Sequence, residues 1–368
     1  MHGRNRHGKT PSPSRQNAAG KLAALGALLL AVFLLSFCLG RYGVPLDQVV
    51  RVLLYRLGAA LGGLLDRLPG VDVGPLFPLE ATWTGQMETV VMQIRLPRII
   101  MACLVGCCLA AAGSTYQGIF QNPMASPDIL GASSGAAFGA ALAILLGGRR
   151  QTVTLSAFFF SILTVALVYL LATRAPGKRV LNLVLAGIMV SSLFTSATSY
   201  IKLVADPTNQ LPEITYWLMG SFTSASYQKI LIGCPLIVAG IIIIYLLRWR
   251  LNILSLSEDE AKASGINLPR TRLIFILAST VITASAVSMC GQVGWIGLLI
   301  PHCARMLVGS NNRYVIPVSL SLGASFMILI DTLSRTISII ELPLSILTAI
   351  IGAPVFITLL NKNRSNLR

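Results

Sequence analysis

The sequence GQVGWIGLLIPHCARMLVG, residues 291–309, decides how the rest of the chain is interpreted. It is too apolar for a loop in water, yet Gly, Pro, His and Arg interrupt it too often for a helix that faces lipid. Residues that break helices are tolerated at membrane depth where neighbouring helices or a cavity satisfy the freed backbone groups. The stretch therefore predicts a buried, irregular helix inside a membrane-embedded bundle.

Composition supports a membrane protein. Of the 368 residues, 54% are hydrophobic and 11% are charged, whereas globular proteins carry about 25% charged residues. The net charge is +16. No basic stripe with interleaved aromatic residues accompanies it, so nucleic acid is not expected as a partner. Anchoring of cytoplasmic loops beside the membrane lipid explains the excess of Lys and Arg more simply.

Neither a metal site nor a cofactor is predicted. The seven cysteines lie in or at the ends of apolar runs and form no CxxC pair, so they are interpreted as small hydrophobic residues. Residues 3–10, GRNRHGKT, match the phosphate-binding pattern G-x-x-x-x-G-K-[ST]. That loop works only between a strand and a helix, and two residues cannot form the strand. We therefore expect no nucleotide site and no catalytic residues.

Apolar runs of about 20 residues, the length that spans a bilayer, recur along the chain and predict an all-α fold with ten transmembrane helices. They are expected at 22–40, 97–118, 125–147, 151–173, 180–204, 227–247, 271–290, 294–309, 314–333 and 343–361. This makes 22–361 a single transmembrane domain between a disordered basic tail at 1–21 and a short tail at 362–368. Residues 41–90 form an outer loop, with one amphipathic or re-entrant helix at 46–68. Within the third span, Gly131, Gly135 and Gly139 share a face and predict close helix packing.

Ten spans place both termini on the same side of the membrane. Basic residues favour the segments on that side and acidic residues favour the other, so both termini are expected in the cytoplasm. Arg95, Arg98 and Arg335 are exceptions at the outer helix ends. They are either structural arginines or a basic rim for an acidic partner. Asp331, four residues before Arg335, is expected to form a helical ion pair with it.

One polar inner segment, residues 248–272, is long enough to carry structure of its own. Ser257 and the acids that follow it resemble a helix start. Gly265 ends that helix and Pro269 prevents its continuation. We expect two short helices at the cytoplasmic surface, as a docking site for a soluble partner.

Several separate motifs then resemble one family. They are RLPR (95–98), GSTYQGIFQNPMASPDILGASSGAAFGA (113–140), LAGI (185–188), YWLMGS (216–221), LNILSLSEDEAKASGI (251–266), GQVGWIGLLIPHCAR (291–305) and ELPLSILTAIIGAPVF (341–356). In this order they resemble the ten-helix permease subunits of ABC importers for iron-siderophores, haem and vitamin B12. The resemblance covers residues from about 90 to 361.

The resemblance implies a bundle like that of the vitamin B12 importer permease, in the bacterial cytoplasmic membrane. It implies a second permease subunit, identical or similar, two cytoplasmic ATPases and an extracytoplasmic substrate-binding protein. The family's docking arginines map onto Arg95, Arg98 and Arg335. Its ATPase-coupling segment maps onto Leu254, Leu256, Glu258, Asp259, Glu260, Ala261 and Gly265, and its inner gate onto Val180, Leu181 and Asn182. Ser257, Ser264 and Trp295 depart from the usual Gly, Leu and Phe.

An Fe(III)-siderophore is the expected cargo, with haem or cobalamin as alternatives. An ion-coupled secondary transporter would need intramembrane acids and two matching broken helices, which the sequence does not show convincingly. A membrane enzyme built on His302 would need a second ligand or a carboxylate. Within residues 291–309, we interpret Gly294, Pro301, His302 and Arg305 as a structural joint. His302 and Arg305 are expected to satisfy polar groups near the coupling segment.

Overall fold

The computed structural model describes residues 15–65, 80–256 and 258–365, and these are all-helical. Seven helices are long and apolar enough to cross a membrane. They are α1 (Arg15–Cys38), the continuous run that ends in α4 (Leu96–Ile119), α6 (Arg150–Arg174), α7 (Arg179–Val204), α9 (Tyr227–Leu254), α11 (Leu268–Cys290) and α13 (Asn312–Thr336). Three shorter apolar stretches complete the predicted ten: α5 (Ala132–Leu145), α12 (Ile296–Val308) and Leu344–Leu359 of α14 (Leu344–Ser365).

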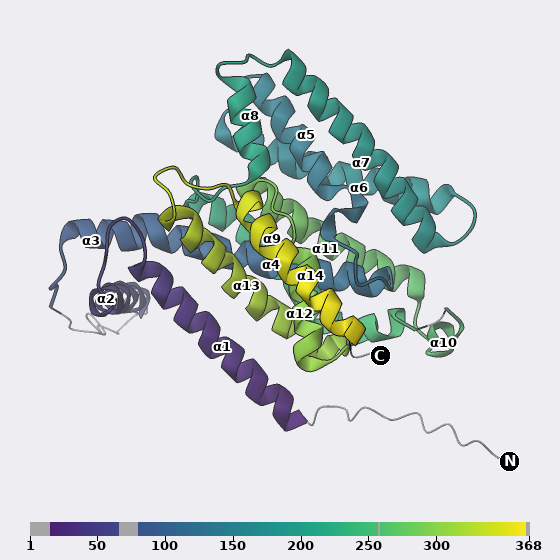
Figure 1. Cartoon of the computed structure of the whole chain (residues 1–368), viewed down its shortest axis with the longest axis horizontal. Coiled ribbons are helices and arrows are strands. Elements are labelled where there is room, and N and C mark those ends of the chain that lie inside the picture. The colour runs from purple at the N-terminus through teal and green to yellow at the C-terminus, as the bar shows by residue number, and fades with distance from the viewer. Residues whose placement is uncertain (1–14, 66–79, 257, 366–368) are drawn as a thin grey trace.

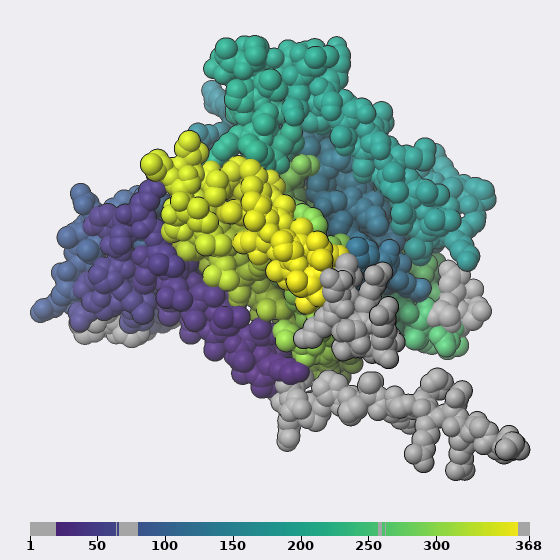
Figure 2. Space-filling view, viewed as in Figure 1, coloured from purple at the N-terminus to yellow at the C-terminus, as the bar shows by residue number. Residues whose placement is uncertain are grey.

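The remaining helices lie at the two ends of the bundle. The start of α1, α10 (Glu258–Ala263) and the end of α14 lie toward the lower right of Figure 1. The opposite end carries α2 (Leu46–Leu65), α3 (Gly85–Thr89) and α8 (Gln210–Met219). These are called below the α10 end and the α8 end. In the space-filling view, α1, α13 and α14 form the front surface and α7 and α8 form the top (Figure 2).

The centre of the bundle consists of α4, α11 and α13. Their most apolar stretches are 72%, 78% and 67% buried, against 33% or less for α1, α6, α7 and α9. Small residues explain this, since α4 contains AAAG at 110–113, and Gly106 faces Gly323 of α13 with no room for a Cβ on either. Small residues let membrane helices approach closely. The outer helices pack around this core and leave apolar faces for lipid or for another subunit.

The helix at 46–68 is confirmed as α2, although residues 66–68 lie outside the described residues. Other elements were not expected, among them α3, α8 and a π-helical turn (Val90–Arg95) that joins α3 to α4. Asp206, in the loop before α8, accepts hydrogen bonds from Thr208 and Asn209. These bonds, those from Thr208 above all, lower the pKa of its carboxyl group.

Three predicted boundaries were wrong. Helix α9 extends to Leu254 instead of 247, because Leu251 and Leu254 are buried in the core and carry the helix past its basic residues. The span expected at 125–147 begins only at Ala132, since Pro127 opens a 3₁₀ turn (Pro127–Leu130, η2) and Gly131 has φ +79. The tails are shorter than expected: α1 includes residues 15–21 and α14 includes 362–365, while 1–14 and 366–368 lie outside the described residues.

Candidate functional site

Helix α7 has a polar face that the rest of the chain does not cover. Ser192, Thr195, Ser196 and Ser199 are exposed along it, at the spacing of one helical face. The hydroxyls of Ser192 and Ser199 donate to the carbonyls of Ile188 and Thr195, a bond that makes a serine tolerable in lipid. These hydroxyls alone therefore do not show that the face is wet.

A cavity beside this face contains a carboxylate. It has a volume of about 510 Å³ and lies between α7 and η2, with Asp128, Ser192, Thr195 and Ser196 among its lining residues. The side chain of Asp128 is exposed and accepts a hydrogen bond from Ser133. An acid in this position is costly against lipid, and such residues usually face a water-filled cavity.

The depth of Asp128 follows from the packing of α7. Gly187 lies against the backbone of Ile129, so closely that a Cβ would clash with the Ile129 carbonyl. Gly187 is eight residues into the 26-residue α7, or about 12 Å along a helix about 39 Å long at 1.5 Å per residue. Asp128 is the neighbour of Ile129 and is therefore well inside the membrane span. Sequence reasoning missed it, although an acid within the apolar run at 125–147 was a usable signal.

The three predicted docking arginines do come together, at the α8 end. With Asp331 and Glu341 they form a cluster that we call the arginine node. Arg95, Arg98 and Arg335 are 4%, 7% and 8% exposed, and Asp331 is fully buried. The node joins α1, α4, α13 and the segment before α14.

Every guanidinium group in the node has partners from the chain itself. Arg98 binds Asp331 Oδ1 at 2.6 Å and makes two parallel bonds to Glu341 at 2.9 and 2.8 Å. The predicted ion pair between Asp331 and Arg335 is confirmed, at 3.5 Å. Arg335 also donates to the carbonyl of Leu39 at 2.6 Å and to Ser36.

Arg95 completes the node by donating to the carbonyls of Phe37 and Tyr42. The structure thus places these arginines inside the fold, where they connect four segments. Docking of the substrate-binding protein through them stays a prediction, and it requires acidic groups to reach side chains that are less than a tenth exposed.

The predicted coupling residues lie at the α10 end. Leu254 ends α9 and is buried, Leu256 is 43% exposed, and Ala261 of α10 is 2% exposed. Gln121, two residues after the end of α4, donates to the carbonyls of Leu254 and Leu256, both at 2.9 Å, and so fixes the segment.

The described residues of this segment contain one short helix where two were expected, because the first part of the segment continues α9. Glu258, Asp259 and Glu260 fall in α10, and Gly265 follows it with φ +73. The proposed serine cap, Ser257, lies outside the described residues. Coupling through this segment stays a prediction.

The predicted structural joint in α12 is connected to α4 by hydrogen bonds of one side chain. Pro301 lacks an N–H, so the carbonyl of Gly297 one turn earlier has no helical donor. Gln117 of α4 supplies one from its Nε2, at 3.3 Å from that carbonyl, and also reaches Leu298 O at 3.4 Å. Arg305 in turn donates to Gln117 Oε1. One side chain thus connects α4 to both halves of α12.

Gly294 and His302, the other members of the predicted joint, take no part in these hydrogen bonds, and His302 Nε2 has no hydrogen-bond partner among the described residues. The His302 ring lies edge-on to Phe356, with ring centres 5.8 Å apart, and Gly294 precedes α12. Of the predicted gate residues, Leu181 is 55% exposed near the start of α7. Asn182 instead donates to the carbonyls of Ala175 and Pro176 at 3.0 and 3.1 Å, and Val180 is half-buried. Within the described residues, no three His, Cys, Asp or Glu side chains group as metal ligands.

The described residues thus form a many-helix membrane bundle with an exposed polar face on α7, the arginine node at one end and the short helix α10 at the other. Residues 28–362 match the model of the FecCD transport family. The chain belongs to this family: it is a permease subunit of an ABC importer. The family resemblance inferred from the sequence motifs is thereby confirmed.

Relatives that are named for the import of different substrates match over most of the chain. The molybdate import system permease protein MolB of Haemophilus influenzae is 37% identical over 342 residues, covering 93% of this chain and 95% of that protein. The cobalamin import system permease protein BtuC of Halobacterium salinarum is 33% identical, covering 92% and 95%.

The fold is likewise that of a solved transporter. A metal-chelate type ABC transporter in an inward-facing conformation superposes with a TM-score of 0.78 at 36% identity, covering 94% of this chain and 99% of that one.

Proposed function

We propose that the exposed face of α7, with Asp128 beside it, lines one half of the translocation pathway of an ATP-driven importer. A second permease subunit, identical or similar, faces it across the pathway. The single observation that carries this is the exposed carboxylate of Asp128 deep in the membrane span, next to exposed hydroxyls. Lipid would disfavour that carboxylate, whereas a water-filled pathway between two subunits accommodates it.

The same proposal orients the chain. The α10 end faces the cytoplasm, where the segment from Leu254 to Gly265 contacts the ATPase subunits, and Leu181 belongs to the inner gate. The α8 end faces the extracytoplasmic binding protein. The exposed Leu256 beside a short helix supports the first contact, because an exposed large apolar side chain next to a fixed backbone suits a protein interface.

For the cargo we propose an Fe(III)-siderophore. Between Leu181 and Tyr200, α7 contains no charged residue, so the α7 side of the proposed pathway is apolar and rich in hydroxyls, and Asp128 is the one carboxylate among the described residues that line the cavity beside it. Such a wall suits a bulky chelate that shields its own charge. Molybdate is the second candidate, on the strength of the relative that matches 93% of this chain.

The test is uptake into liposomes that contain the chain with its ATPase and binding protein. We expect ATP-dependent uptake of radioactive iron-siderophore, abolished when the catalytic residue of the ATPase is disabled. Ser196→Trp places a bulky ring in the cavity and should reduce uptake at least tenfold. Leu231→Trp, on the exposed apolar face of α9, is the matched control and should leave uptake unchanged.

The outcomes separate the pathway from the cargo. Uptake of molybdate and not of the siderophore would contradict the proposed cargo and would leave the proposed pathway unchanged. Full uptake by Ser196→Trp would show that this face of α7 is not the pathway. Uptake that persists with the disabled ATPase would contradict the pump itself.

A further inference from the structure

A groove at the α8 end, away from the α7 face, has no role in the proposed pathway. Helices α6 and α9 both pack on α11, and between them a cavity of about 740 Å³ remains. Its floor is formed by residues of α11, including Ser285, Ser288 and Met289. A second cavity of about 620 Å³ adjoins it under α8 and shares several lining residues with it.

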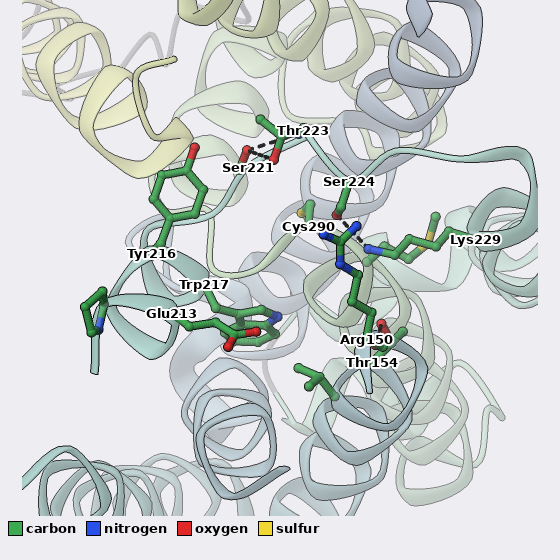
Figure 3. Close-up of a pocket in the computed structure, with 13 residues that line it drawn as sticks. Arg150, Thr154, Glu213, Tyr216, Trp217, Ser221, Thr223, Ser224, Lys229 and Cys290 are labelled. Carbon is green, nitrogen blue, oxygen red and sulfur yellow. Dashed lines mark hydrogen bonds between the residues drawn. The ribbon is translucent and has the colours of Figure 1, made fainter. Parts of the chain in front are cut away.

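Two cations face the mouth of the groove. Arg150 begins α6 and Lys229 lies in the first turn of α9, and both line both cavities. Figure 3 shows them extending into the same space beside Ser224, whose hydroxyl lies 2.7 Å from Lys229 Nζ. Two like charges that face the same cavity repel each other unless an anion lies between them.

The described residues supply no such anion. Among them, no carboxylate lies within ion-pair distance of Arg150 or Lys229. Glu213 lines the adjoining cavity, where it lies beside Trp217 on the α8 side (Figure 3). The contrast with the arginine node is direct, since there every guanidinium group has an internal partner.

The floor of the groove also contains a hydroxyl group that makes no hydrogen bond within the described residues. Ser285 is 2% exposed, lines the larger cavity, and its Oγ has no hydrogen-bond partner among the described residues. A buried hydroxyl without a partner is costly. The hydroxyl of Ser285 is therefore available to a hydrogen-bonding atom of a molecule in the groove.

Below the cations the walls of the groove become apolar. Leu155 and Phe158 of α6 form one side, and Ile232 and Leu236 of α9 form the other. Leu236 is nine residues beyond Tyr227, which places it about 14 Å into the span at 1.5 Å per residue. Leu155, Ile232 and Leu236 are 62%, 59% and 40% exposed. A small free oxyanion would make no use of this apolar extension.

We propose that the groove binds an anionic phospholipid. Its phosphate lies between Arg150 and Lys229, and an acyl chain lies between α6 and α9. An oxygen of its glycerol or ester region reaches Ser285. Cations at the membrane surface attract anionic lipid head groups, and apolar walls at acyl depth add contact area that scales with chain length. The site is separate from the pathway and does not depend on which cargo the importer carries.

The test is lipid retention by the full chain, delipidated in detergent and then measured by native mass spectrometry. Dioleoylphosphatidylglycerol should be retained and dioleoylphosphatidylcholine should not. The double variant Arg150→Gln with Lys229→Gln should lose about thirty-fold in retention, since each cation near an anionic lipid contributes roughly a factor of five. Arg149→Gln changes an exposed neighbouring cation that does not line the groove, and should have no effect.

A charge-conserving variant, Arg150→Lys with Lys229→Arg, should retain the lipid and so separate loss of charge from loss of folding. Competition identifies the source of the phosphate. Inorganic phosphate or glycerol 3-phosphate that displaces the lipid at equal concentration would show a site for free anions and would overturn the proposal. Equal retention of the anionic lipid by the Gln double variant, or equal retention of phosphatidylcholine by the unchanged chain, would overturn it too.

Discussion

The α8 end of the bundle holds two groups of cations in opposite states. In the arginine node, buried guanidinium groups bind Asp331, Glu341 and backbone carbonyls of α1. In the groove between α6 and α9, Arg150 is exposed and Lys229 is bonded only to a hydroxyl among the described residues. Position at a membrane boundary therefore does not by itself assign a role to an arginine. A cation whose partners come from the chain itself stabilises the fold, and a cation without them needs a partner from outside.

The largest effect in this comparison is expected from Asp331→Asn. This carboxylate is fully buried and is shared by Arg98 and Arg335. Removing one partner from a buried ion pair leaves charge uncompensated and costs about 3–5 kcal/mol. The unfolding transition of the purified chain in detergent should shift accordingly. An unchanged transition would show that the node does not stabilise the fold.

A smaller effect is expected from Glu341→Gln. The side chain of Glu341 is 27% exposed and makes two hydrogen bonds to Arg98. Arg98 also binds Asp331, so it keeps a carboxylate partner when Glu341 is changed. Gln keeps the shape and one acceptor, and solvent screens part of the lost charge, so the loss should be about 1 kcal/mol. The same unfolding measurement applies. If Glu341→Gln lowers the free energy of unfolding as much as Asp331→Asn does, burial does not determine how much each of the two acids stabilises the fold.

The smallest effect is expected from Arg150→Gln. This side chain is exposed and has no ion pair among the described residues, so nothing inside the fold is lost. Surface substitutions of this kind usually change the free energy of unfolding by less than about 0.5 kcal/mol. The measurement is made in lipid-free detergent, and Arg149→Gln is the control. If Arg150→Gln lowers the free energy of unfolding and Arg149→Gln does not, Arg150 stabilises the fold as the arginines of the node do.

Sequence alone predicted the ten spans, because runs of apolar residues of spanning length are a local property of the chain. It also predicted the ion pair between Asp331 and Arg335, since four residues on one helix fix the geometry. It could not show that Glu341 binds Arg98, because 243 residues separate them and packing alone brings them together. The same holds for Gln117 and Gly297, which lie 180 residues apart.

The missed residues have physical explanations of their own. Asp128 was hidden because Pro127 and Gly131 convert the start of an apparent span into a turn, and this exposes the carboxylate beside α7. The extension of α9 was hidden because RWR at 248–250 resembles the end of a span. The structure shows that Leu251 and Leu254 remain in the core beyond it.

The pairing of Arg98 with Asp331 also sets an order of events during synthesis. Arg98 emerges from the ribosome 233 residues before its carboxylate partner. At about 5–20 residues per second, that interval is roughly 12–47 s. Throughout it, neither Asp331 nor Glu341 has been synthesised, so Arg98 lacks both of the carboxylates that it binds in the folded chain. The node can therefore be completed only after α13 and the segment before α14 have been synthesised.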